Sequence, residues 1–181
     1  VHDLNFVISY VDDICCLARD GKEMVRNLAI IIDRMRKGNL QLSPKKCNLC
    51  ATELTFLGHV LTPDGIKVDK TKVEALSKAP KPTNLKALKR FLGAAAFMRK
   101  FVFAFANRTS NMRRLLKKDQ KFLWGPKEDA EYQDIVDALT NAPVLGYYQQ
   151  GLPTYLYVDA SLTSVAYAIS QMFAEGEKFI T

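Results

Sequence analysis

The chain has 181 residues, 48% of them hydrophobic and 25% charged, with a formal net charge of +7. This composition excludes a disordered chain, and no apolar run approaches the roughly 20 residues of a membrane-spanning helix. Four cysteines in a chain of this length do not suggest a disulfide framework, which favours a reducing, intracellular compartment. Because the sequence starts at Val1 and runs directly into a strand pattern, we expect it to be part of a longer protein.

The positive charge is concentrated in the middle of the chain. Between Lys67 and Lys121 there are sixteen Lys and Arg residues and three acids. A block of this kind favours a polyanionic partner such as nucleic acid. A solvated helical face is an equally consistent interpretation of the charge taken alone.

The first predicted element is a β-hairpin with strands over residues 5–10 and 14–18. The sequence Val-Asp-Asp at 11–13 forms its turn. Apolar side chains at helical spacing then predict a helix over 24–35, which ends at the following Gly-Asn pair. Residues 40–42 are compatible with a further short strand.

Cys47 and Cys50 have the spacing of a zinc knuckle. The sequence supplies no second ligand pair at similar spacing, and His59 is the only imidazole nearby. A structural zinc ion and small buried thiols both fit the spacing, and the thiols are the favoured interpretation.

A second hairpin is predicted over residues 54–68. Its first strand is 55–61, Pro-Asp-Gly at 63–65 forms the turn, and the return strand follows directly. Asp69 is placed to cap a short helix that runs to Ser77.

Helices and then strands follow a stiff linker formed by Pro80 and Pro82, which indicates a subdomain boundary. The predicted helices are 84–105, 108–118 and 128–141, and the predicted strands are 154–158, 165–170 and a third near the end of the chain. The first of these helices carries an apolar stripe made of Leu85, Leu88, Phe91, Leu92, Ala95, Met98, Phe101 and Val102. The element order indicates an α+β fold.

The adjacent acids Asp12 and Asp13 require an explanation, because like charges repel and Asp is a poor strand residue. One alternative is a solvent-exposed turn with no function. The other is a cation site, because Mg²⁺ prefers carboxylate and phosphate oxygens and a hairpin between apolar strands is a rigid mount.

Six motifs in order carry a resemblance to a known family. Residues 10–13 read Tyr-Val-Asp-Asp and are similar to the Tyr-x-Asp-Asp signature of reverse transcriptases. The other motifs are Leu-Ser-Pro-Lys-Lys-Cys at 42–47, Phe-Leu-Gly-His-Val at 56–60, Phe-Leu-Gly at 91–93 with Phe-Met-Arg-Lys-Phe-Val at 97–102, Phe-Leu-Trp at 122–124 with Ala-Pro-Val-Leu at 142–145, and Asp-Ala-Ser at 159–161. Over essentially its whole length the chain resembles the reverse transcriptase of gypsy-type LTR retrotransposons, as part of a Pol polyprotein.

The resemblance implies four subdomains. Residues 1–79 would be the C-terminal part of a polymerase palm, built from antiparallel hairpins and a helix. Residues 80–121 would be a basic helical thumb, 122–153 the connection, and 154–181 the first strands of an incomplete RNase H-like domain. In the family, the fingers, the first palm Asp and the nucleotide pocket lie upstream of Val1. The family's glycines after Asp-Ala-Ser are replaced here by Ser164 and Ala166.

The resemblance also implies roles for single residues. Asp12 and Asp13 would be two of three palm carboxylates that hold Mg²⁺ or Mn²⁺, and Lys46 would contact a phosphate or protonate the departing pyrophosphate. Leu57 and Gly58 would press on the primer backbone. The remaining implied nucleic-acid contacts are Tyr10, Val11, Lys86, Lys89, Arg90, Arg99 and Lys100, and Asp159 would be the first RNase H carboxylate.

The implied partners are an RNA or DNA template with a DNA primer, a dNTP in the complete enzyme, and no membrane; by family the protein would occur in a cytoplasmic particle or the nucleus. We expect the isolated chain to be inactive. Two alternatives remain open: a nucleic-acid-binding remnant without chemistry, and a degenerate structural relic. Simpler interpretations also remain for Trp124 as a packing residue, Tyr10 as a support for the turn, His59 as a structural residue and Asp159 as a cap.

Overall fold

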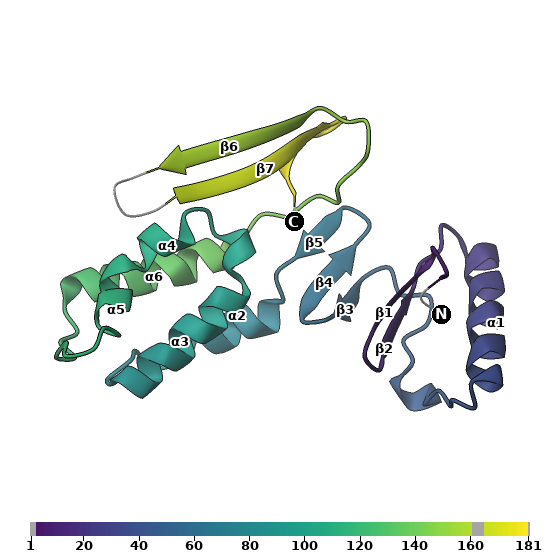
Figure 1. Cartoon of the computed structure of the whole chain (residues 1–181), viewed down its shortest axis with the longest axis horizontal. Helices are drawn as coiled ribbons and strands as arrows, with labels where there is room; N and C mark the ends of the chain where they lie inside the picture. The colour runs from purple at the N-terminus through teal and green to yellow at the C-terminus, as the bar shows by residue number, and fades with distance from the viewer. Residues whose placement is uncertain (1–2, 161–164, 181) are drawn as a thin grey trace. The chain divides into compact units, whose positions relative to one another are not determined.

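The structure is a computed structural model that describes residues 3–160 and 165–180. The chain divides into two compact units, residues 1–56 and residues 57–181. Helices and strands are grouped along the chain, as Figure 1 shows, so the predicted α+β class is confirmed. The two units do not correspond to the four implied subdomains, whose bounds stay predictions.

The first unit contains the predicted hairpin and helix. Strands β1 (Val7–Tyr10) and β2 (Asp13–Cys16) pair antiparallel, and α1 (Gly21–Lys37) lies beside them (Figure 1). Helix α1 begins at Asp20, whose carboxylate accepts a hydrogen bond of 2.8 Å from the Glu23 N–H. Asn27 donates to the Leu17 carbonyl at 2.9 Å and so ties the helix to the end of the hairpin.

Two predictions for the rest of this unit are wrong. Residues 40–42 form no strand, since three residues without a neighbouring strand gain too few hydrogen bonds to hold an extended conformation. A short 3₁₀ turn, η1 (Pro44–Lys46), follows instead. Cys47 and Cys50 are exposed rather than buried. Strand β3 (Leu54–Phe56) ends the unit.

The second unit starts with a strand break that the sequence did not predict. Leu57 and Gly58 have φ angles of +49° and +76°, so the predicted strand 55–61 is interrupted there. A hairpin of β4 (His59–Thr62) and β5 (Gly65–Lys67) follows, with Thr62 opposite Gly65.

Two of the predicted helices of this unit, 84–105 and 108–118, are shorter in the structure, whereas the other two form close to their predicted bounds. The observed bounds are α2 (Lys70–Ser77), α3 (Leu85–Phe97), the 3₁₀ turn η2 (Arg99–Phe101), α4 (Phe105–Arg108), α5 (Ser110–Arg114) and α6 (Pro126–Thr140). The predicted helix 84–105 ends at Phe97, because Met98 leaves helical geometry at φ −98° and ψ +8° and Val102 is extended at φ −121° and ψ +106°. The predicted helix 108–118 is divided at the buried Thr109, whose hydroxyl donates to the Phe105 carbonyl at 2.8 Å.

The core of the second unit joins these helices. Its fully or almost fully buried side chains include Leu88, Ala95, Met98, Phe101, Met112, Leu115, Ile135 and Leu139. Each such Leu, Ile, Phe or Met contributes about 1.5–3 kcal/mol through burial. Leu85 does not belong to the predicted stripe, since it is 41% exposed.

An antiparallel sheet ends the second unit. Its strands are β6 (Thr154–Ala160), β7 (Val165–Phe173) and β8 (Gly176–Phe179), in the order β6-β7-β8. The buried Gln171 side chain donates to the Gln149 carbonyl at 2.9 Å and accepts from the Gln149 N–H at 2.8 Å. The predicted strands are confirmed, while Ser161 and Ser164 lie outside the described residues.

Candidate active site and nucleic-acid interface

The two adjacent acids lie at the tip of the β1–β2 hairpin. Tyr10 and Asp13 form its last pair, so Val11 and Asp12 alone make the turn. Val11 has φ +53°, a conformation that is unfavourable for a β-branched side chain by about 1–3 kcal/mol. Its side chain is 90% exposed, so packing of that side chain does not compensate for the strain.

The carboxylates of Asp12 and Asp13 are open to solvent. Among the described residues, neither has a cation within ion-pairing distance or a hydrogen-bond donor. Their oxygen atoms are therefore free to bind a hard divalent cation such as Mg²⁺, and the donor type fits. No group of three or more His, Cys, Asp or Glu side chains that could hold a metal ion occurs in residues 3–160 and 165–180, so further ligands for such an ion would come from elsewhere.

The other predicted site residues are distributed over several elements. Lys46 ends η1 in the same unit as Asp12 and Asp13, and its side chain is exposed. Asp159 lies near the end of β6, exposed and opposite Ala166 on β7. The structure thus brings Tyr10, Val11, Asp12 and Asp13 together on one turn.

The Leu57–Gly58 turn packs against an aromatic cluster. A Cβ atom on Gly58 would lie 2.8 Å from Cζ of Phe97 and 2.5 Å from Nζ of Lys72. The Phe97 ring stacks on the His59 imidazole with centroids 5.0 Å apart and an angle of 9° between the planes. A glycine is therefore required by both φ and space at this turn.

His59 is enclosed by this cluster and by two lysines. Within the described part of the chain, its Nδ1 atom is buried and has no hydrogen-bond partner. Burial, with the charges of Lys100 and Lys72, lowers the pKa of His59, so the imidazole is neutral at pH 7.

The predicted basic surface is exposed as expected from its sequence pattern. Its members on α3 and η2 are Lys86, Lys89, Arg90, Arg99 and Lys100. These side chains lie on two successive elements, a geometry that suits contacts along a phosphate backbone.

Some of the central positive charge is neutralised within the chain by acids of α6, which the sequence did not indicate. Arg108 pairs with Asp134 at 3.3 Å, and Arg114 pairs with the buried Glu128 at 3.7 Å. Arg108 and Asp134 are 26 residues apart in the sequence, so no local spacing could have identified that pair.

Trp124 packs into the helical unit. Its indole N–H donates to Asp129 at 2.6 Å, and its ring meets that of Tyr132 edge to face with centroids 6.3 Å apart. The structure thus places Trp124 among aromatic neighbours of the core.

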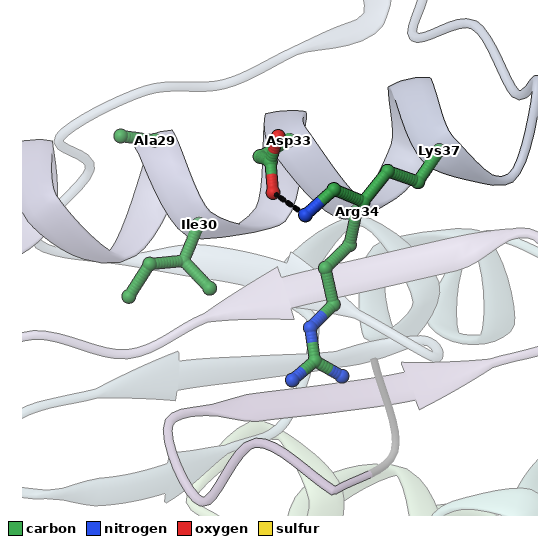
Figure 2. A pocket seen from close by; sticks show the side chains of 5 residues that line it. All are labelled: Ala29, Ile30, Asp33, Arg34 and Lys37. Carbon is green, nitrogen blue, oxygen red and sulfur yellow. Dashed lines mark ion pairs between the residues drawn. The ribbon is translucent and has the colours of Figure 1, made fainter.

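A hollow of about 460 Å³ lies along α1, and Figure 2 shows the five side chains that line it. Asp33 pairs with Lys37 at 2.8 Å, and Arg34 pairs with Asp3 at 2.5 Å. Because its charged groups are already paired, this hollow is not a convincing ligand site. No helix in the described part of the chain is long and apolar enough to span a membrane.

Two family comparisons match different parts of the chain. Residues 2–61 match the family described as reverse transcriptase (RNA-dependent DNA polymerase). Residues 124–181 match the family described as RNase H-like domain found in reverse transcriptase.

Curated relatives are polyproteins of transposons. A retrovirus-related Pol polyprotein from transposon opus of Drosophila melanogaster is 33% identical over 173 residues, which covers 90% of this chain and 17% of the relative. The transposon Tf2-3 polyprotein of Schizosaccharomyces pombe is 27% identical over 165 residues, which covers 91% of this chain and 12% of the relative. The chain thus spans less than a fifth of the length of either relative.

Solved structures share the fold. A foamy viral protease–reverse transcriptase in complex with double-stranded DNA matches with a TM-score of 0.85 at 24% identity, over 99% of this chain and 32% of that chain. A second structure of a foamy viral protease–reverse transcriptase, in complex with an RNA/DNA hybrid, matches with a TM-score of 0.84 at 24% identity, over 99% of this chain and 24% of that chain. Residues 2–61 therefore match the reverse transcriptase family and residues 124–181 the RNase H-like domain family found in reverse transcriptase, and the chain as a whole is similar to segments of transposon Pol polyproteins.

Proposed function

We propose that this chain contributes metal ligands and primer–template contacts to an RNA-directed DNA polymerase. The observation that carries the proposal is the hairpin turn, which exposes Asp12 and Asp13 next to a strained Val11. Strain at an exposed position that gains nothing from packing is typical of functional sites. The gypsy-type subclass remains part of the proposal.

In this proposal Asp12 and Asp13 hold Mg²⁺ or Mn²⁺. When bound, such ions neutralise charge on the phosphates of the incoming dNTP and activate the primer 3′-hydroxyl. The carboxylates position the ions, Val11 lies next to the primer end, and Lys46 contacts a phosphate. Two carboxylates do not complete the octahedral coordination of Mg²⁺. Further oxygen ligands would come from the nucleotide, from water and from a carboxylate outside the described residues.

The proposed nucleic-acid partner is a DNA primer on an RNA or DNA template. The Leu57–Gly58 turn would contact the primer backbone, because the absence of a side chain at Gly58 permits close approach. The exposed cations of α3 and η2 would bind phosphates of the duplex. The foamy viral enzymes of the same fold are complexes with double-stranded DNA and with an RNA/DNA hybrid, which supports this choice of partner.

Asp159 is the corresponding candidate in the RNase H-like segment. It lies on strand β6, and its side chain is exposed and open to a metal ion. We propose it as one carboxylate of a nuclease site whose other ligands would come from further along the RNase H-like domain.

Primer extension tests whether the isolated chain is inactive, as we expect. The 181-residue chain is incubated with an RNA template, a DNA primer and dNTPs, in Mg²⁺ and separately in Mn²⁺. We expect salt-sensitive binding of the primer–template and no extension, because two carboxylates alone bind the metal weakly. Extension by the wild-type chain that is lost in Asp12→Asn, and retained in the control Asp64→Asn in the turn of the other hairpin, would contradict the proposed inactivity of the isolated chain.

A binding function without chemistry is the second candidate, and the exposed cations of α3 and η2 favour it. In that case Asp12→Asn leaves both the affinity for duplex and its salt dependence unchanged in every context. A longer Pol polyprotein that contains this segment separates the two candidates, since Asp12→Asn abolishes its extension activity only if Asp12 serves the polymerase.

A further inference from the structure

A lysine outside the predicted nucleic-acid surface lies directly against the Leu57–Gly58 turn. Lys72 is in the first turn of α2, and its ammonium nitrogen lies where a Cβ atom on Gly58 would be only 2.5 Å away. The same nitrogen is 4.3 Å from the centroid of the Phe97 ring. Because Gly58 has no side chain, the Lys72 ammonium and the Phe97 ring can both lie close to the turn.

The aromatic ring beside this ammonium attracts it. A cation over the face of an aromatic ring is drawn to it by the ring quadrupole. The Phe97 ring is itself held, because it stacks on the His59 imidazole. In the structure the charge of Lys72 therefore lies beside the turn, over the Phe97 ring.

The charge of Lys72 is not neutralised by a neighbouring acid. Among the described residues it forms no ion pair, whereas Lys78 on the same helix pairs with Glu74 at 3.2 Å. Hydrogen bonds from Thr71 and, more weakly, the charge of Lys72 lower the pKa of Asp69, but the Asp69 carboxylate is bonded to Thr71. Lys72 is therefore a cation that no acid among the described residues pairs with.

The surface beside Lys72 suits a polynucleotide strand. A hollow of about 450 Å³ lies between α2 and α3, and Lys72 and Arg90 are its two charged lining residues. Its other lining side chains are apolar, and Phe97 is one of them. The two cations would bind phosphates of such a strand, and the apolar lining would contact its sugars.

We propose that Lys72 binds a phosphate of the primer strand beside the Leu57–Gly58 turn and so acts as a positioning residue for the primer backbone. The inference rests on the proposed function, because it takes this turn as a primer contact. It adds a residue of α2 to a surface that the sequence assigned to the turn, α3 and η2.

Duplex binding as a function of salt tests this role. The affinity of the full chain for a fluorescent DNA primer–template duplex is measured over a salt series for wild type, Lys72→Met, Lys72→Arg and the control Lys78→Met. One lost phosphate contact reduces the slope of log K against log salt by about 0.9. We expect this reduction in Lys72→Met only. Lys72→Gln gives the same comparison with a polar neutral side chain should Lys72→Met not fold.

Neutral linkages in the primer locate the contact. A methylphosphonate is placed at one primer phosphate at a time, and affinities are compared between wild type and Lys72→Met. At the phosphate that Lys72 binds, the losses from the linkage and from the substitution are not additive, because each removes the same contact. A merely structural role for Lys72 produces additive losses at every linkage.

The outcomes distinguish the two proposals. A wild-type chain that shows no salt-dependent binding overturns the proposed function and, with it, the role of Lys72. A wild-type chain that binds with a slope equal to that of Lys72→Met overturns the role of Lys72 alone.

Discussion

Replacement of Gly58 by alanine should destabilise the second unit by about 1.5–2.5 kcal/mol, as the sum of two costs. Gly58 has φ +76°, where a residue with a Cβ atom is less stable by about 1 kcal/mol or somewhat more. The new Cβ would also lie 2.8 Å from Cζ and 3.1 Å from Cε1 of Phe97. The ring must move off the His59 imidazole, and such an aromatic contact contributes about 0.5–1.5 kcal/mol. The Lys72 ammonium moves at little cost, because it ends a flexible side chain.

Urea unfolding followed by the fluorescence of Trp124 measures this cost, because the single tryptophan belongs to the same unit as Gly58. Gly151→Ala is the matched control. Gly151 has φ +93°, and a Cβ atom added there would have no atom within 4 Å, so only the backbone cost of about 1 kcal/mol applies. If the two substitutions lower the free energy of unfolding equally, the close packing of Phe97 against the turn is not a real constraint and the reasoning fails.

Two further predictions concern the helical unit. Glu131→Ala should lower the free energy of unfolding by about 2–3 kcal/mol, because the carboxylate accepts hydrogen bonds from the N–H groups of Asn111 and Met112, both at 2.9 Å. Asp137→Ala on the exposed face of the same helix should change it by about 0.5 kcal/mol or less, and urea unfolding compares the two. The stability of the wild-type chain should fall as the pH drops from 7 to 5, because burial and the nearby lysines lower the pKa of His59 and the unfolded state binds the proton more readily. His59→Gln should give a flatter pH profile in the same assay, and an unchanged profile would show that the imidazole is solvated in the folded chain.

Local signals in the sequence predicted the elements that depend on local interactions. The β1–β2 hairpin forms around the predicted turn and α2 begins after the predicted capping residue Asp69, whereas α1 begins at Gly21, before the predicted start at residue 24. The carboxylate of Asp69 accepts a bond of 2.9 Å from the Thr71 N–H, as expected of a capping residue. The identity of the catalytic candidates likewise came from a short contiguous motif.

Features that depend on distant contacts or on unusual backbone angles were missed. Leu57 at φ +49° looks like an ordinary strand residue in the sequence, since nothing local distinguishes it. Apolar spacing continued past Phe97 although the backbone leaves the helix, because Phe101 and Val102 still reach the same core from η2 and the segment after it. Lys72 could have been suspected only by knowing that Phe97 and Gly58 meet in space.

The exposed sheet at the end of the chain has a consequence for every unfolding and binding measurement described above. All seven residues of β6 are exposed, Leu156 and Val158 by 65% and 63%, and in the described sheet β6 has a neighbour on one side only. A strand with an open edge and apolar side chains promotes edge-to-edge pairing between copies. The fraction of paired copies rises with concentration, so measurements at high concentration would report the behaviour of an assembly. The concentration at which light scattering begins to rise therefore sets the upper limit for studying the properties of the single chain.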